Sequence, residues 1–180
     1  MNYQRIARRI RVPLGFIFAA LFLWRAHPTP QSLVWSVPAI AAGLALRAYS
    51  SGYVNKNTEL ATTGPYAYTR NPLYLASFVL ALGFIIAARS WLLLVTFIVL
   101  FAIIYIPTIL SEEVWLRDNF LSFENYCRRV PRFFPRLTPA YLPGGGAFSA
   151  ALYRKHREYN SFMGAAGVYA VLLLKWWLQR

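Results

Sequence analysis

The 180-residue chain has few of the residue types on which soluble enzymes commonly depend. Its one cysteine, Cys127, excludes an internal disulfide and any site built from several cysteines, and we expect a reduced, inert thiol there. The two histidines, His27 and His156, fall in different predicted loops without neighbouring metal ligands, so we expect no metal site. The sequence contains neither a G-x-G-x-x-G nor a Walker motif. These absences argue against a soluble dinucleotide-binding or phosphate-loop enzyme.

Long apolar runs determine the expected fold class. Hydrophobic residues make up 58% of the chain, and the twenty residues from Trp91 to Leu110 carry no charge. At about 1.5 Å per residue, such a helix crosses a hydrocarbon core of about 30 Å. The sequence therefore predicts an all-α, polytopic membrane helical bundle of about five transmembrane helices. The shorter runs are Val12–Trp24, Leu33–Leu46 (extended through Tyr53), Leu73–Ala88 and Phe162–Leu174.

The segments between these runs predict interfacial structure. Residues 114–123 keep an apolar stripe among charges, which is typical of an amphipathic helix lying in the membrane interface. Residues 128–136 are basic and contain two prolines, so we expect a loop. The glycines after Pro143 predict a flexible joint. The N-terminal arginines before a short apolar run imitate a signal peptide, but no clear small-residue cleavage site follows, so we expect a retained anchor.

The strongly basic balance, a net charge of +13, is explained by membrane topology. If the N-terminus is cytoplasmic, only Arg25, Arg89, Lys175 and Arg180 lie outside, and all other Lys and Arg residues lie inside. This distribution follows the positive-inside rule and favours anionic lipid headgroups. We therefore expect an inner-membrane protein whose N-terminus and site are cytoplasmic, and no nucleic-acid partner is needed to explain the charge.

The stretch Gly64–Tyr74 predicts a loop that becomes a buried helix at Pro72. Proline is tolerated at the first helical position, and Asn71 is expected to cap the helix with its side-chain oxygen. Free N–H groups and the positive end of the helix dipole then face a loop that carries Arg70, which suits a ligand with an anionic end. An ordinary capped helix start at the interface would show the same residues. The aromatic faces available to a positive centre are those of Tyr66, Tyr68 and Tyr74.

Two adjacent carboxylates stand at the end of the longest run. The turn at Arg89 and Ser90 is so short that the flanking helices must form an antiparallel hairpin, which brings Glu112 beside the start of the preceding helix. Glu113 has a predicted partner in Arg117, four residues on. Glu112 has no such partner, so it either faces water or awaits a cation or hydroxyl groups from a ligand. Together these groups match S-adenosylmethionine, which has a carboxylate, an ammonium, ribose hydroxyls and a sulfonium.

At these residues the chain resembles the isoprenylcysteine carboxyl methyltransferase and phospholipid methyltransferase group of integral-membrane enzymes. The matching pieces, in that group's order and spacing, are Leu60–Tyr66, Arg70–Tyr74, Glu112–Leu116, and Tyr126 with Val130–Pro131. The resemblance implies S-adenosylmethionine as cofactor, with Glu112, Arg70 and Asn71 as catalytic residues. The donor-binding residues that it implies are Thr58, Glu59, Leu60, Ala61, Tyr66, Asn71, Pro72, Leu73, Tyr74 and Glu112.

Two departures from the group bear on the substrate. The histidine usual between Arg and Pro is Asn71 here, and an amide cannot take a proton as a base. The arginine usual four residues before the first Glu, thought to meet a substrate carboxylate, is Thr108. Carboxyl methylation is therefore less well supported, and a phospholipid amine, a lipid hydroxyl or a thiol becomes a more plausible acceptor.

The leading hypothesis is a membrane methyltransferase that transfers a methyl group from S-adenosylmethionine to a lipophilic acceptor at the cytoplasmic face. We expect a single membrane domain composed of an N-terminal hairpin (1–57), a donor-binding core (58–136) and a basic segment with the last helix (137–180). Membrane lipids and a lipid or small-molecule acceptor are the expected partners, with no obligate protein partner. The alternatives are an NADPH-dependent membrane reductase and a non-catalytic lipid-binding scaffold.

Overall fold

The computed structural model describes residues 3–55, 58–141 and 146–179, with the side chains of the first helix described from Pro13 onward. These residues form seven α-helices and one short 3-10 helix, and no strand occurs among them. The all-α prediction is thus confirmed. The helices are α1 (Tyr3–Arg25), α2 (Pro30–Ser51), η1 (Gly64–Ala67), α3 (Pro72–Ala88), α4 (Trp91–Asn119), α5 (Phe123–Arg129), α6 (Ala150–Lys155) and α7 (Tyr159–Leu178).

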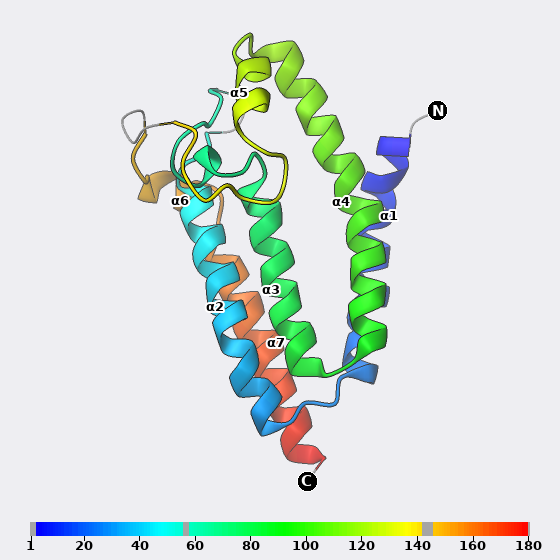
Figure 1. Ribbon diagram of the computed structural model, residues 1–180. Coiled ribbons are helices and arrows are strands. Elements are labelled where there is room, and N and C mark those ends of the chain that lie inside the picture. The colour runs from blue at the N-terminus through cyan, green and yellow to red at the C-terminus, as the bar shows by residue number, and fades with distance from the viewer. Residues whose placement is uncertain (1–2, 56–57, 142–145, 180) are drawn as a thin grey trace.

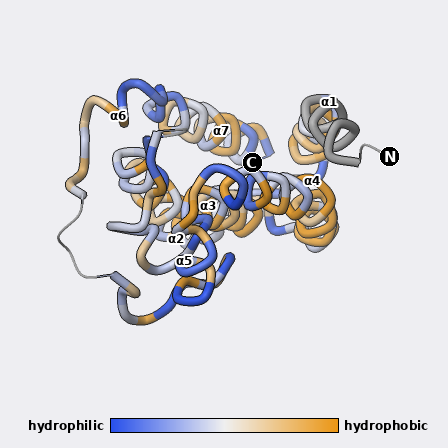
Figure 2. The backbone as a smooth tube through the Cα atoms, turned by 90° about the horizontal axis from the view of Figure 1, so that it is seen from above, coloured by the Kyte–Doolittle hydropathy of each residue, from blue (hydrophilic) through white to orange (hydrophobic). Residues whose placement is uncertain are grey.

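The five long helices run roughly along one axis, and the chain reverses direction at each turn (Figure 1). Helices α2, α3 and α7 lie together, while α1 packs beside α4. The N-terminus, α5 and α6 lie at one end of the bundle, called the upper end below, and the C-terminus lies at the other. Figure 2 shows hydrophilic stretches mixed with hydrophobic ones around α5 and α6, whereas α4 is mainly hydrophobic.

Three of these helices are long and apolar enough to cross a membrane: α2, α4 and α7. Helix α3 and the part of α1 from Pro13 to Arg25 are apolar but shorter. The protein is therefore an integral-membrane helical bundle, and a total of five spans remains a prediction that depends on these two shorter helices.

Helices α2 and α3 pack closely because glycine stands at two crossing points. A Cβ on Gly43 of α2 would lie 2.6 Å from the backbone nitrogen of Leu80, and one on Gly83 of α3 would lie 2.8 Å from that of Ile40. Small residues allow this backbone approach, which increases van der Waals contact between membrane helices.

The lower end of the bundle is closed by a cluster of buried apolar residues. Hydrogen bonds join the turns there: the Ser32 hydroxyl donates to the Ala87 carbonyl over 2.9 Å, and the His27 N–H donates to the Ala88 carbonyl over 2.9 Å. Lys175 of α7 donates to the carbonyl of Leu23 in α1. The members of the cluster are Phe22, Ala26, Leu33, Ala87, Ala88, Leu93 and Leu172.

The expected interfacial helix over residues 114–123 is wrong in its boundaries. Helix α4 continues without a break through Glu112 to Asn119, and α5 is a separate helix of seven residues. No Gly or Pro separates Glu112 from Asn119, so nothing in the sequence stops the helix there. The predicted loop after α5 is confirmed from Val130 onward, and the predicted joint at Pro143 falls outside the described residues.

Candidate functional site

The predicted hairpin of α3 and α4 brings two of the predicted site residues into contact. Arg89 adopts a left-handed conformation, with φ 53°, and Ser90 caps α4 by accepting a hydrogen bond from the Leu93 N–H over 3.4 Å. Because the helices are antiparallel, the first turn of α3 faces the later part of α4. The Tyr74 hydroxyl donates to a carboxylate oxygen of Glu112 over 2.8 Å. The predicted juxtaposition of the start of α3 with the Glu112 region is confirmed, although α4 itself continues to Asn119.

Glu112 is exposed at the upper end, and its negative charge acts on Tyr66 as well as on its hydrogen-bond donor Tyr74. The Tyr66 side chain is buried, and burial is the main reason its pKa rises above the usual range, followed by the negative charge of Glu112. The Tyr66 carbonyl accepts a hydrogen bond from the Tyr126 hydroxyl over 2.8 Å. Glu112, Tyr66 and Tyr74 therefore form one local group, called the Glu112 site below.

The neighbouring carboxylate has a different role, and the predicted pairing of Glu113 with Arg117 is wrong. Glu113 is buried and accepts hydrogen bonds from the Arg132 guanidinium over 2.8–3.2 Å, and its other charged neighbour is Arg70 at 3.2 Å. Arg117 instead pairs with Glu124 of α5. Glu113 faces the loop that follows α5, so a residue nineteen positions later reaches it better than one on its own helix.

Arg70 is held in the ion pair with Glu113. One of its terminal nitrogens lies 3.2 Å from Glu113 and donates to the Cys127 sulfur over 2.6 Å. Its Nε is buried and has no hydrogen-bond partner among the described residues. The structure therefore gives Arg70 a role in holding α3, α4 and α5 together, and its predicted contact with an anionic ligand stays a prediction.

Asn71 does not cap α3 in the predicted manner. Helix α3 begins at Pro72 as expected, but the side chain of Asn71 makes no capping hydrogen bond among the described residues. Its amide nitrogen donates instead to the Arg132 carbonyl over 2.9 Å. The loop after α5 runs close to Asn71 and offers a backbone acceptor, which the local sequence could not reveal.

The loop after α5 runs alongside residues 67–70, which precede α3. Several hydrogen bonds join the two segments. The Arg70 N–H donates to the Pro131 carbonyl over 2.9 Å, and the Thr69 hydroxyl donates to the Phe133 carbonyl over 2.9 Å. Two further bonds, from the N–H groups of Arg136 and Ala140, reach the carbonyls of Tyr68 and Ala67 over 3.0 and 2.9 Å. Sequence reasoning missed this attachment because loops carry no periodic pattern.

The remaining predicted donor-binding residues lie in the loop before α3 and at the first two positions of that helix. Thr58 and Glu59 are exposed, and Leu60 packs against the buried cluster of Phe123, Tyr126 and Val130. Ala61 and Leu73 are half-buried, and Pro72 is fully buried. Through Leu60, the loop from residue 58 to residue 71 is thus packed against α5, and Tyr74, in the first turn of α3, donates a hydrogen bond to Glu112.

Aromatic rings extend from the Glu112 site along the space between α3 and α4. The ring of Tyr74 lies edge-on to Tyr105 with centroids 5.3 Å apart, and Tyr105 stacks on Phe101 at 4.4 Å. Phe101 in turn contacts Phe78 of α3 at 5.0 Å and Phe133 of the loop at 5.9 Å. The loop after α5 therefore completes an aromatic wall below the site.

A second ion pair, which sequence reasoning missed, joins α2 to the start of α7. The Arg47 guanidinium of α2 donates to both oxygens of Glu158, over 2.5 and 3.1 Å, and to the Ser77 hydroxyl of α3. A charged residue within an apolar helix normally has a buried partner, so the position of Arg47 in the sequence already indicated that it pairs with another side chain. The partner could not be named, since Glu158 lies 111 residues away.

The described residues contain no group of three or more His, Cys, Asp and Glu side chains that could hold a metal ion. The groups that can bind a ligand at the upper end are therefore the first turn of α3, the exposed carboxylate of Glu112 and the rings of Tyr66 and Tyr74. This set suits a ligand that has an anionic group together with hydroxyl or cationic groups.

Comparison with known proteins gives a family and two relatives. A family model described as phospholipid methyltransferase matches residues 32–122, half of the chain, and this range includes Tyr66, Tyr74 and Glu112. The chain is 41% identical over 109 residues to the nickel-cobalt-cadmium resistance protein NccN of Alcaligenes xylosoxydans xylosoxydans, covering 58% of this chain and 50% of that protein. It is 30% identical over 135 residues to the cobalt-zinc-cadmium resistance protein CzcN of Cupriavidus metallidurans, covering 71% of this chain and 62% of that protein.

No solved structure matches the chain. The chain spans between half and two thirds of the length of these two relatives. The family match covers the helices and the loop from which the Glu112 site is built. The chain belongs to the phospholipid methyltransferase family.

Proposed function

We propose that this protein transfers a methyl group from S-adenosylmethionine to a lipophilic acceptor at the cytoplasmic face of the inner membrane. The observation that carries the proposal is the hydrogen bond from Tyr74, in the first turn of α3, to the exposed carboxylate of Glu112. It brings a helix N-terminus and a carboxylate together inside the region matched by the phospholipid methyltransferase family.

The side chains of the site fit the chemistry of this donor. The N–H groups at the start of α3, with the helix dipole, suit its carboxylate. Glu112 uses one oxygen to accept from Tyr74 and retains acceptor capacity for an ammonium or for ribose hydroxyls. The ring of Tyr74 offers a face to the positive sulfonium.

When bound, S-adenosylmethionine supplies an activated methyl group, so the protein needs no covalent catalysis. The contribution of the chain is to align donor and acceptor and to exclude water. Glu112 and the first turn of α3 hold the donor end, while the aromatic wall of Phe78, Phe101 and Tyr105 suits an apolar acceptor approaching from the bilayer. Asn71 has its amide on the Arg132 carbonyl and cannot serve as a base, so we assign it a positioning role.

Calorimetry on the full chain in detergent tests donor binding. We expect S-adenosylmethionine to bind to the unaltered chain and binding to be lost in Glu112→Ala. Glu124→Ala is the matched control, because Glu124 is also an exposed carboxylate at the upper end but pairs with Arg117. Binding that survives in Glu112→Ala contradicts the proposed site. Binding of NADPH in place of S-adenosylmethionine favours the reductase alternative.

Turnover requires a separate assay with a labelled methyl donor. Candidate acceptors are phosphatidylethanolamine, an isoprenylcysteine and a total bacterial lipid extract. Because Thr108 stands where the related enzymes carry an arginine for a carboxylate, we expect label in a lipid amine, hydroxyl or thiol before a carboxyl group. Donor binding without transfer to any acceptor favours the non-catalytic scaffold.

The names of the relatives suggest a second, physiological candidate, which is a contribution to tolerance of nickel, cobalt or cadmium. We infer that such a role, if shared, acts through the Glu112 site. Expression in a metal-sensitive host should raise metal tolerance for the unaltered chain and not for Glu112→Ala. If the unaltered chain and Glu112→Ala give equal metal tolerance, metal resistance does not depend on the Glu112 site.

A further inference from the structure

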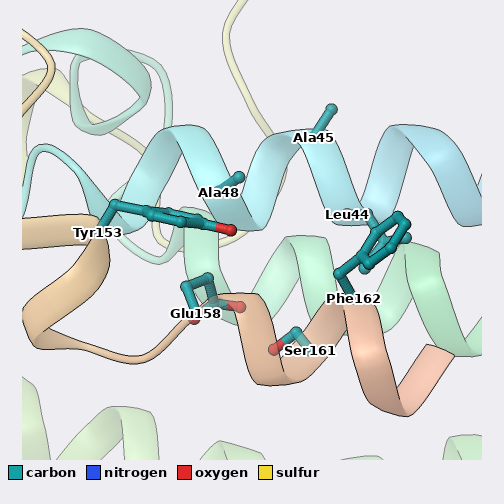
Figure 3. Close-up of a pocket in the computed structure, with 7 residues that line it drawn as sticks. All are labelled: Leu44, Ala45, Ala48, Tyr153, Glu158, Ser161 and Phe162. Carbon is teal, nitrogen blue, oxygen red and sulfur yellow. The ribbon is translucent and has the colours of Figure 1, made fainter. Parts of the chain in front are cut away.

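A cavity of about 230 Å³ lies between α2, α6 and α7 and shares no lining residue with the Glu112 site (Figure 3). Its two ends differ in chemistry. Leu44 and Phe162 lie at one end, and Tyr153 and Glu158 lie at the other (Figure 3). Ala45 lines the wall on α2 and is exposed on the helix surface. The cavity thus opens on the surface of the bundle, with an apolar end at Leu44 and Phe162 and a polar end next to α6.

The polar end does not carry a free negative charge. Glu158 is 9% exposed and both of its oxygens accept hydrogen bonds from the Arg47 guanidinium. Arg47 is fixed in turn by the Ser77 hydroxyl of α3. Since the carboxylate is already neutralised, the cavity is poorly suited to a cation such as a free amine headgroup.

Exposed cations stand at the same end. Arg154, Lys155 and Arg157 are all exposed, and they occupy the turn between the cavity-lining residues Tyr153 and Glu158. Arg157 has φ 51°, and this left-handed residue makes the sharp turn from α6 into α7. Basic residues at the end of a membrane helix attract the phosphates of anionic lipids.

The size of the cavity limits what can enter it. A water molecule occupies about 30 Å³ of liquid, and pockets for whole drug-sized ligands begin at about 300 Å³. The cavity can therefore hold a segment of a chain but not a whole lipid. A hydrocarbon segment fits the apolar surface of Leu44, Ala45 and Phe162.

We propose that this cavity seats an acyl chain of one anionic phospholipid, whose phosphate lies against Arg154, Lys155 and Arg157. The bound lipid fills the space between α2 and α7 and joins them at the upper end. The site is separate from donor binding and turnover, so it stands or falls independently of the methyltransferase proposal.

Native mass spectrometry of the full chain in detergent, titrated with phosphatidylglycerol or phosphatidylcholine, tests the proposal. We expect the unaltered chain to retain phosphatidylglycerol in preference to phosphatidylcholine. Replacement of Arg154 and Lys155 by Gln should weaken this retention by about five-fold for each cation removed. The matched control replaces Arg128 and Arg129, two exposed cations of α5, by Gln and should retain the lipid as the unaltered chain does.

Filling the cavity gives the second test. Ala48→Phe places a ring in the cavity from α2 (Figure 3) and should abolish retention of phosphatidylglycerol. If the melting temperature shows that this variant is unfolded, Ser161→Leu fills the same cavity from α7. Retention equal to that of the unaltered chain in the folded variant overturns the proposal. Equal retention of both lipids, or displacement of phosphatidylglycerol by millimolar inorganic phosphate, also overturns it.

Discussion

Glu113→Gln tests the ion-pair cluster that holds the loop after α5 over the start of α3. Glu113 is 5% exposed, and the Arg70 side chain beside it is 12% exposed, so the change leaves a buried guanidinium without its counter-charge. Removing one partner of a buried pair costs about 3–5 kcal/mol. The other partner, Arg132, is 51% exposed and can turn to water, which favours the lower end, about 3 kcal/mol.

For a chain of this size, each kcal/mol lowers the melting temperature by about 2–4 °C, so we expect a decrease of about 6–12 °C. The assay is thermal unfolding of the full chain in one detergent, followed by tryptophan fluorescence. Glu124→Gln is the matched control, because it makes the same chemical change in the exposed pair with Arg117, and we expect no measurable decrease. Equal melting temperatures for the two variants would refute the argument that Glu113 is the structural carboxylate.

Three further predictions follow from packing and burial. Gly43→Ala should destabilise the chain by about 1–3 kcal/mol, because the new Cβ meets the Leu80 backbone, whereas Gly164→Ala, which meets nothing within 4 Å, should not lower the melting temperature. Tyr126→Phe should cost about 1–3 kcal/mol in chemical unfolding, because it leaves the Tyr66 carbonyl without its donor. Burial raises the pKa of both Tyr66 and Tyr126, so the stability that their neutral forms contribute is fully present below about pH 10 and is lost progressively as the pH rises from there through their raised pKa values. Melting temperature and tyrosinate absorbance measured across that range check this, and ionisation of all tyrosines near pH 10 in the folded chain would contradict it.

The sequence by itself determined the membrane bundle and the two helix ends that form the Glu112 site. Long apolar runs specify helices because only internally hydrogen-bonded backbone is stable in lipid. Pro72 specified the start of α3, and the short turn at Arg89 specified an antiparallel hairpin. Those two constraints bring the start of α3 and Glu112 to the same end of the bundle, whereas the hydrogen bond between Tyr74 and Glu112 was not itself predicted.

Only the tertiary structure decided the partners of the other charged and polar groups. Spacing on one helix predicted Arg117 for Glu113, but Arg132 and Arg70 pair with it. Asn71 was expected to cap its own helix, but its amide reaches the Arg132 carbonyl.

The physical reason is the range of the interactions. Helix starts, helix reversals and pairs four residues apart depend on neighbouring residues, which the sequence lists directly. The partner of a buried charge depends on which distant segment packs against it, as with Arg47 and Glu158, which lie 111 residues apart. In the low-dielectric interior, the bond with the best geometry replaces the one suggested by spacing.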